Sequence, residues 1–397
     1  MSRKRRKAGL GLLALTLLTG CWSSAAIEDL NLQVGLALDS GERTESEKRL
    51  IQEGGSVPEP DLVDSTYQFL LLQSSKKSGT SGNSVTSYYN ATESGESLIR
   101  NVRELALRSA RQPIAHHLKV IVIGERLARK LSLSDLIDFF SRDNDIRPSV
   151  IFAVSRGRAR DVFERALPGE IPAFVLVDTF DNRNRTNRIW EPVSLGKITG
   201  PLHTKQSFLL QAVAPGNKEN KFAGAAVIEG ATGKLRGFLN EEELEGAVWL
   251  TGRGKGGVVQ TTDPKSGNMI SYEIKFMKSK IVAAVQGEEV SFHVKMESDG
   301  RLAESFLAGE EYNEALLERE KVAFEAKVRA LAKATLTKLQ REYRVDALGF
   351  GDYMRIQHPA VWRKIKGNWD ERFSRAKVTY EVKLNIEEYG ATKRDID

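Results

Sequence analysis

The first 21 residues constrain this chain more than any other feature, because they end at Cys21, the only cysteine among 397 residues. Five cations occupy positions 3–7, a mostly apolar run follows at 10–18, and Thr19 and Gly20 precede the cysteine. This order is typical of a signal peptide, and the run is much shorter than the roughly 20 apolar residues that span a bilayer. We therefore predict that residues 1–20 are a signal peptide and that the rest is exported.

The segment Leu18-Thr19-Gly20-Cys21 resembles the lipobox of bacterial lipoproteins. The resemblance implies cleavage after Gly20, an S-diacylglycerol group on the Cys21 sulfur and acylation of the new amino group. Two or more acyl chains anchor a protein stably, whereas a single chain binds a membrane only marginally. An ordinary secreted protein, or a cysteine buried in an uncleaved helix, is the alternative.

Composition and charge limit the classes of protein that this chain can form. It is 41% hydrophobic and 28% charged, which is ordinary for a globular protein, and its length suits two or three domains. The formal net charge is +6, but positions 1–20 hold five cations and no acid, so the remaining chain carries +1. Nucleic-acid binding depends on clustered cations, and we therefore expect no nucleic-acid partner. No later stretch of the sequence is long and apolar enough to span a membrane.

The first half of the chain, at 22–194, predicts one α/β domain. Alternation at 31–39 predicts a half-buried strand with one apolar face, made of Leu32, Val34, Leu36 and Leu38. Apolar runs at 118–124 and 149–154 predict buried parallel strands that flank a helix in a βαβ unit. The other elements expected here are loops at 40–60 and 74–95, a strand at 65–73, and helices at 96–111 (capped by Ser94), 127–140 and 159–166.

The second half predicts antiparallel strands with a long covering helix. A strand, turn and strand at 224–237 precede a helix at 241–250, a hairpin across 257–276 and strands at 280–285 and 289–297. The longest element is a charged helix at 312–343 with a narrow apolar stripe, which we expect to pack on a sheet; a partner-binding coil is the alternative. We divide this half into a middle domain at 195–276 and a C-terminal domain at 277–397. The fold class is mixed α/β of the α+β type, with several domains.

The search for reactive side chains assigns no catalytic, cofactor-binding or metal-binding residue. Only two of the five histidines are adjacent, and neighbours on a strand or helix point apart. Asp143 and Asp145 could bind a cation, but two carboxylates alone are a weak signal. The histidines are His116, His117, His203, His293 and His358.

Two polar segments resemble ligand sites only in composition. The glycine-rich segment 252–257 lacks the Lys-Ser/Thr pair of a phosphate loop and does not lead from a strand into a helix, so we assign it to a loop. The segment 178–190 is polar and rich in cations. An anionic-ligand patch would explain it, but we favour a solvated loop or helix end.

A series of different short motifs extends along almost the whole chain from residue 20 onward. They are Gly20-Cys21-Trp22, a strand ending in Asp39, residues 116–125, 142–147, 223–227 and 235–237, and, most specific, residues 346–351 followed by His358-Pro359, Trp362, Trp369 and Phe373. In order and spacing these motifs resemble the Ger(x)C family, the lipoprotein C subunits of spore germinant receptors. The chain departs from the family near the tether, where Ser23 and Ala26 replace the usual Asp and Glu.

The resemblance implies a three-domain lipoprotein on the outer face of the spore inner membrane. It would act there with two integral membrane subunits, A and B, in a receptor for small nutrients. Cys21 is the one site residue that carries over, and no catalytic residue or cofactor does. We expect a noncatalytic scaffold or coupling subunit, with Trp362, Trp369 and Phe373 in its core; a docking surface is the alternative for these aromatic residues.

Two other functions stay open from the sequence. The first is a solute-binding lipoprotein that captures the germinant itself. The second is a cell-envelope hydrolase, whose catalysis would depend on His116, His117 or His358. The absence of a catalytic motif does not exclude this second function, because catalytic residues can be assembled by folding.

Overall fold

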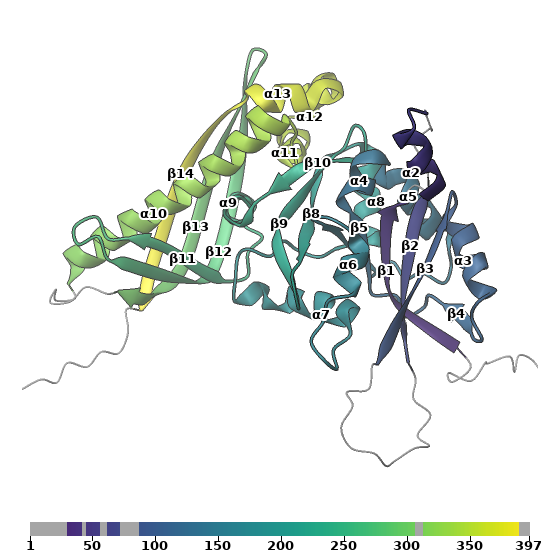
Figure 1. Ribbon diagram of the computed structural model, residues 1–397. Coiled ribbons are helices and arrows are strands. Elements are labelled where there is room, and N and C mark those ends of the chain that lie inside the picture. The colour runs from purple at the N-terminus through teal and green to yellow at the C-terminus, as the bar shows by residue number, and fades with distance from the viewer. Residues whose placement is uncertain (1–29, 42–44, 56–61, 72–86, 306–312, 389–397) are drawn as a thin grey trace, which may run out of the picture.

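The computed structural model describes residues 30–41, 45–55, 62–71, 87–305 and 313–388. These residues build two sheets, with helices packed on both faces of the larger one and on one face of the smaller (Figure 1). The predicted α+β, multidomain class with a long covering helix is confirmed. Cys21 lies outside the described residues.

The larger sheet has ten strands, with β10-β9-β8-β6-β5-β1-β2-β3 as its main order, β4 paired with β1, and β7 paired with β6. The neighbours β1, β5, β6 and β8 run parallel at its centre, as the βαβ pattern predicts. The strands are β1 (Leu30–Ser40), β2 (Val63–Leu70), β3 (Tyr88–Gly95), β4 (Gln112–Ile114), β5 (Val120–Gly124), β6 (Ile151–Ser155), β7 (Val193–Ser194), β8 (Phe208–Pro215), β9 (Asn220–Glu229) and β10 (Lys234–Leu239).

Helices cover both faces of this sheet, which buries its central strands except at some of their ends. One face packs against α3 (Leu98–Ala106), α4 (Glu125–Lys130), α5 (Leu133–Arg142) and α8 (Leu195–Thr204). The other packs against α6 (Ala159–Phe163) and α7 (Pro172–Thr179), after which the turn η2 (Phe180–Asn184) follows. The prediction of a half-buried β1 is therefore wrong. A register shift between Gln33 and Gly35 also places Val34 in a different core cluster from Leu36 and Leu38.

Several local predictions in this half need correction. A helix, α2 (Glu45–Gln52), lies in the expected loop at 40–60, and β3 lies in the expected loop at 74–95. The expected helix at 127–140 is two helices, because the Ser132 hydroxyl accepts the N–H of Ser134 and starts α5 anew. Ser94 does not cap α3; its hydroxyl donates to Asp64, and the helix begins after Ser97.

The smaller sheet has the order β11-β12-β13-β14. The predicted hairpin between β11 (Gly257–Thr262) and β12 (Met269–Gln286) is confirmed, and β13 (Glu289–Ser305) pairs antiparallel with β12. The last strand, β14 (Lys377–Glu388), runs parallel to β13, so the antiparallel pairing predicted for the strands up to residue 297 does not extend to it. A chain that leaves β13 can return parallel because helices of 313–375 carry it back along the sheet.

The helices of the second half lie on one face of this sheet and at one of its ends. The covering helix α10 (Glu314–Thr337) continues as a π-helical turn, η3 (Lys338–Tyr343), and α9 (Glu241–Thr251) packs beside it. The apolar stripe at Phe324 and Val328 is buried, as predicted. The remaining helices are α11 (Phe350–Gln357), α12 (Pro359–Ile365), the turn η4 (Lys366–Asn368) and α13 (Trp369–Arg375).

One hydrophobic core cluster connects the two sheets. It contains Leu209 and Val227 of the larger sheet, Phe324 of α10 and Met296 of the smaller sheet. The sheets themselves divide the chain between β10 and β11, and β12 runs through residues 276 and 277. The division into domains at 195 and 277 stays a prediction about folding units.

Candidate functional site: the joint between the two sheets

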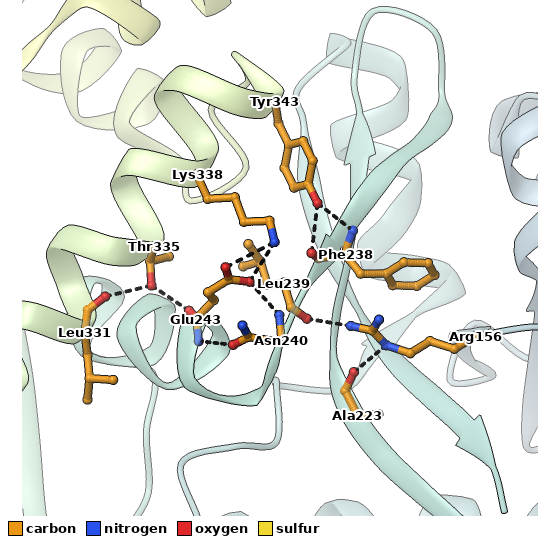
Figure 2. A network of polar contacts seen from close by, with 10 residues as sticks. All are labelled: Arg156, Ala223, Phe238, Leu239, Asn240, Glu243, Leu331, Thr335, Lys338 and Tyr343. Atoms are coloured by element: carbon orange, nitrogen blue, oxygen red, sulfur yellow. Dashed lines mark hydrogen bonds and ion pairs between the residues drawn. The ribbon is translucent and has the colours of Figure 1, made fainter.

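The edge strand β10 meets the end of η3 through one tyrosine (Figure 2). The hydroxyl of Tyr343 donates to the carbonyl of Phe238 at 2.9 Å and accepts the N–H of the same residue at 3.0 Å. A Cβ at Gly237 would lie 2.5 Å from the Tyr343 side chain, so only glycine permits this close approach. One phenol therefore satisfies both backbone groups of an edge-strand residue that would otherwise be open.

The N-terminus of α9 forms the second contact of the joint. Asn240 and Glu243 form a capping box, in which each side chain binds the backbone N–H of the other residue. Both carboxylate oxygens of Glu243 also lie 3.1 Å from the Lys338 Nζ. Burial opposes the charge on Lys338, but the hydrogen bond to Glu243 and the charge of that carboxylate raise its pKa overall. The hydroxyl of Thr335 adds a bond of 2.7 Å to the carbonyl of Glu243.

Arg156 holds the other side of Phe238. Its guanidinium donates to the carbonyls of Ala223, at 2.8 Å, and Leu239, at 3.0 Å. The same group lies 4.4 Å from the centre of the Phe238 ring, within the range of a cation–π contact. Arg156, the residue that follows β6, is therefore connected through β9 and β10 to the helix that covers the smaller sheet (Figure 2).

A buried carboxylate organises the helices after η3. Asp346 accepts the backbone N–H groups of residues 348–351 at 2.6–3.3 Å and the indole N–H of Trp369 at 2.8 Å. Burial raises the pKa of Asp346 to about 6, although the Trp369 and backbone N–H groups act in the opposite direction. This carboxylate fixes the start of α11 and joins it to α13.

The aromatic residues of the C-terminal motif pack around Asp346. Phe373 is fully buried and Trp369 is 9% exposed, which confirms their assignment to the core. Trp362 is half-buried and meets Trp369 edge to face, with ring centres 5.2 Å apart. A Cβ at Gly351 would lie 2.8 Å from Trp369 and 2.9 Å from Trp362, so this glycine is required for the packing.

The same helices also contact the larger sheet. The Asp370 carboxylate accepts the N–H of Asp346 at 3.0 Å and lies 3.5 Å from the hydroxyl of Ser207, which precedes β8. Burial raises the pKa of Asp370. Gln206 donates to Asp352 of α11 at 3.1 Å.

A groove of about 1000 Å³ opens at this contact, between α8 and β8 on one side and α11–α13 on the other. Trp190, Trp362 and Trp369 line it together with charged side chains of both signs. The carboxylates that line the groove each accept a hydrogen bond from a backbone N–H, a hydroxyl or a cationic side chain of the same chain. Among the described residues, no ion pair holds its three exposed lysines, which are Lys197, Lys205 and Lys366.

The structure separates the histidines of the hydrolase hypothesis. His116 is exposed and lies 3.1 Å from the Asp145 carbonyl, while His117 is exposed beside it. His358 lies 3.1 Å from the carbonyl of Ala283, on the smaller sheet. The described residues contain no group of three His, Cys, Asp or Glu side chains placed to hold a metal ion. Asp143 accepts the N–H of Asp145 and so forms a turn.

The two polar segments singled out in the sequence pack against each other. Gly252 ends α9, and a Cβ at Gly257 would lie 2.7 Å from the backbone of Asn187. Asn187 is 2% exposed and donates to Glu245, which also pairs with Arg188. The interpretation of 178–190 as a solvated loop or helix end fits its first half, where α7 and η2 end and most side chains are exposed. It needs correction near the end of the segment, where Asn187 is buried against α9. Burial raises the pKa of Glu245.

Sequence reasoning found Asp346 and its aromatic neighbours through their motif, but it missed Arg156, Glu243, Lys338 and Tyr343 as a network. In the part of the chain that the structure describes, no helix has the length and apolar character to cross a membrane. These features define a multidomain α+β protein built around a polar joint.

Comparison with known proteins identifies the family of this chain. Residues 23–215 match the family described as "Spore germination protein N-terminal domain", and residues 223–390 match "Spore germination B3/ GerAC like, C-terminal". Spore germination protein YndF of Bacillus subtilis (strain 168) is 39% identical over 98% of both chains. Spore germination protein B3 of the same organism is 32% identical over 95% of this chain and 96% of its own.

A solved structure agrees with these matches. The crystal structure of the GerBC protein gives a TM-score of 0.61 at 31% identity and covers 82% of this chain and 94% of that chain. The chain therefore belongs to the Ger(x)C family of spore germination proteins, as its motifs predict.

Proposed function

We propose that this chain is the lipid-anchored C subunit of a nutrient germinant receptor, and that it acts without catalysis. The observation that carries the proposal is the match of both halves of the chain to spore germination families, at 39% identity to one relative over 98% of its length. Its partners would be the A and B integral membrane subunits, at the outer face of the spore inner membrane.

The anchor would be Cys21, which carries an S-diacylglycerol group and an acylated amino group after cleavage at Gly20. The order of basic, apolar and small residues before Cys21 supports this assignment. Two or more acyl chains would hold the protein stably at the membrane.

The joint supports a coupling role for the body. Tyr343, Glu243 and Lys338 connect the larger sheet to the long helix of the smaller one, so a displacement of one sheet would be transmitted to the other. A scaffold that passes a signal between membrane subunits needs such connections but needs no reactive group.

A Cys21→Ala variant tests the anchor and the receptor role together. We expect the variant to fold, to lack the lipid by intact-mass analysis, and to abolish the nutrient response of the spores. Ser24→Ala, three residues along the tether, is the matched control and should keep both lipid and response. Wild-type protein purified from spore membrane should carry two integral membrane proteins with it. Normal germination of the Cys21→Ala spores would contradict the proposal.

The groove at the joint favours a second candidate function, the capture of the germinant itself. Its volume of about 1000 Å³, its tryptophans and its exposed lysines suit a small solute with an anionic group, and ligand sites often lie at domain interfaces. Isothermal titration of nutrients into the protein should then release heat at micromolar concentrations, and Trp362→Ala should abolish it. The hydrolase alternative gains no support, because His116 and His358 lie against different elements.

A further inference from the structure

We propose that the outer surface of α3 and the segment after it bind an anionic lipid surface. This surface, the α3 patch, consists of Ile99, Arg100, Arg103, Leu107, Arg108 and Arg111. The inference rests on the proposed lipid anchor at Cys21, and it goes beyond the anchor by assigning a face of the folded body to the membrane.

The patch contains large apolar side chains that are unusually exposed to solvent. Leu107 is 80% exposed, more than any other large apolar residue that the structure describes, and Ile99 is 54% exposed. Ile99, Arg103 and Leu107 are spaced by four residues and therefore follow one face of the helix. The opposite face buries Asn101 and Leu105 against the larger sheet.

The patch also concentrates positive charge. Four arginines and one glutamate lie between Leu98 and Gln112, a net charge of +3, whereas the whole chain after residue 20 carries +1. Arg100 lies near Glu104 and Arg108 binds Glu93. No ion pair with another described residue holds Arg103 or Arg111, so their charge is available to a partner.

The described part of the chain begins beside this patch. Leu30, the first described residue, pairs with Gln112 in the sheet. The Asn31 side chain donates to the hydroxyl of Ser109 at 2.6 Å and to the carbonyl of Arg111 at 3.4 Å. The nine steps from Cys21 to Leu30 reach at most about 30 Å when fully extended. A lipid on Cys21 would therefore hold the membrane within reach of the α3 patch.

The chemistry of the patch suits an acidic bilayer surface. Arginines attract anionic headgroups, while leucine and isoleucine enter the boundary between headgroups and acyl chains. The anchor raises the local lipid concentration at the patch, so a contact that is weak alone becomes populated. Because α3 and β4 lie at one end of the molecule and the four-stranded sheet at the other, this contact would point the smaller sheet away from the bilayer (Figure 1).

The test uses the full-length, lipidated protein in vesicles. Cys21 is the only cysteine and its sulfur would carry the lipid, so Leu107→Cys introduces one reactive thiol for a polarity-sensitive dye. We expect the dye emission to shift to the blue in vesicles of phosphatidylglycerol, but not in vesicles of phosphatidylcholine. Ile356→Cys is the matched control, because Ile356 is 68% exposed on α11 and should stay in water in both.

The charge of the patch is tested in the same assay. Each arginine contributes roughly fivefold to binding at an anionic surface, so Arg103→Gln with Arg111→Gln should weaken the contact about 25-fold. Arg341→Gln with Arg363→Gln removes the same charge far from the tether and should leave the shift unchanged.

The possible failures can be told apart. A vesicle-bound protein whose dye at position 107 stays in water would overturn the patch and leave the anchor intact, and the surface would then be open to a protein partner. A protein without lipid that sediments apart from the vesicles would overturn the anchor, and the patch proposal with it.

Discussion

At the scale of single residues, the Asp346 carboxylate accepts an unusually large number of hydrogen bonds. One carboxylate accepts four backbone N–H groups and the indole N–H of Trp369. Asp346→Ala would leave these donors without a protein acceptor. Because each buried unsatisfied donor costs about 1–3 kcal/mol and the structure can relax in part, we expect the free energy of unfolding to fall by about 3–5 kcal/mol.

Urea unfolding at pH 7 measures this loss. Asp138→Ala is the matched control, because Asp138 forms an exposed pair with Arg142 one turn along α5. Such pairs contribute only about 0.3–0.5 kcal/mol. Equal losses in the two variants would show that the buried carboxylate does not organise α11 and α13.

At the scale of elements, one ion pair joins the β11–β12 turn to the covering helix. The Asp263 carboxylate is fully buried and accepts the Arg319 Nε at 2.6 Å and the Ser266 N–H at 2.7 Å. Burial alone would raise the pKa of Asp263, but Arg319 and Ser266 together lower it to about 2. As the pH falls, the Asp263 carboxylate takes up a proton near pH 4 in the unfolded chain, but only near pH 2 in the folded protein. The pair therefore contributes about 2 kcal/mol of stability above pH 4, which is lost as the pH falls toward 2.

Asp263→Asn should remove this part of the pH dependence. The difference in the free energy of unfolding between wild type and variant should be largest at pH 5 and should shrink by pH 3. Arg319→Gln should give a similar loss, and the double variant should lose less than the sum of the two single variants. A difference that stays constant between pH 5 and pH 3 would contradict the assignment.

Elements with a strong local signal were predictable from the sequence. The apolar runs of β5 and β6, the hairpin of β11 and β12, and the stripe of α10 all follow from periodicity and turn chemistry. The polar strand β3 was not, because its residues Tyr88–Gly95 resemble a loop in composition and form a strand by pairing with β2. The displacement of Val34 depends on a register shift, which alternation alone does not reveal.

The candidate site was predictable only where a motif marked it. Asp346, Trp369 and Phe373 belong to one motif, and the structure brings them together. Tyr343 and Phe238 lie 105 positions apart, and Lys338 and Glu243 lie 95 apart. No local pattern relates residues at such separations, since their contact follows from how the two sheets pack. The groove is a product of the same packing and has no sequence signal of its own.

At the scale of the whole molecule, both sheets share one core and one polar joint. Leu209 of the larger sheet and Met296 of the smaller belong to the same buried cluster, with Phe324 of α10 also part of it. The joint adds directional contacts to this apolar core, because the Tyr343 hydroxyl fixes the edge of β10 against η3. We therefore expect the two sheets to move and unfold together.

Tyr343→Phe tests this connection with the loss of a single oxygen. The N–H and carbonyl of Phe238 would both lose their partner, so we expect the free energy of unfolding to fall by about 1–3 kcal/mol and the Phe238 amide to exchange hydrogen faster. Tyr380→Phe is the matched control, because the Tyr380 hydroxyl makes no hydrogen bond with the described residues and its removal should change neither quantity. If the joint couples the sheets, faster exchange should extend from β10 to η3, on the other side of the missing bond. Faster exchange confined to β10 would mean that the core alone holds the sheets together, and that the tyrosine protects an edge strand without transmitting anything across it.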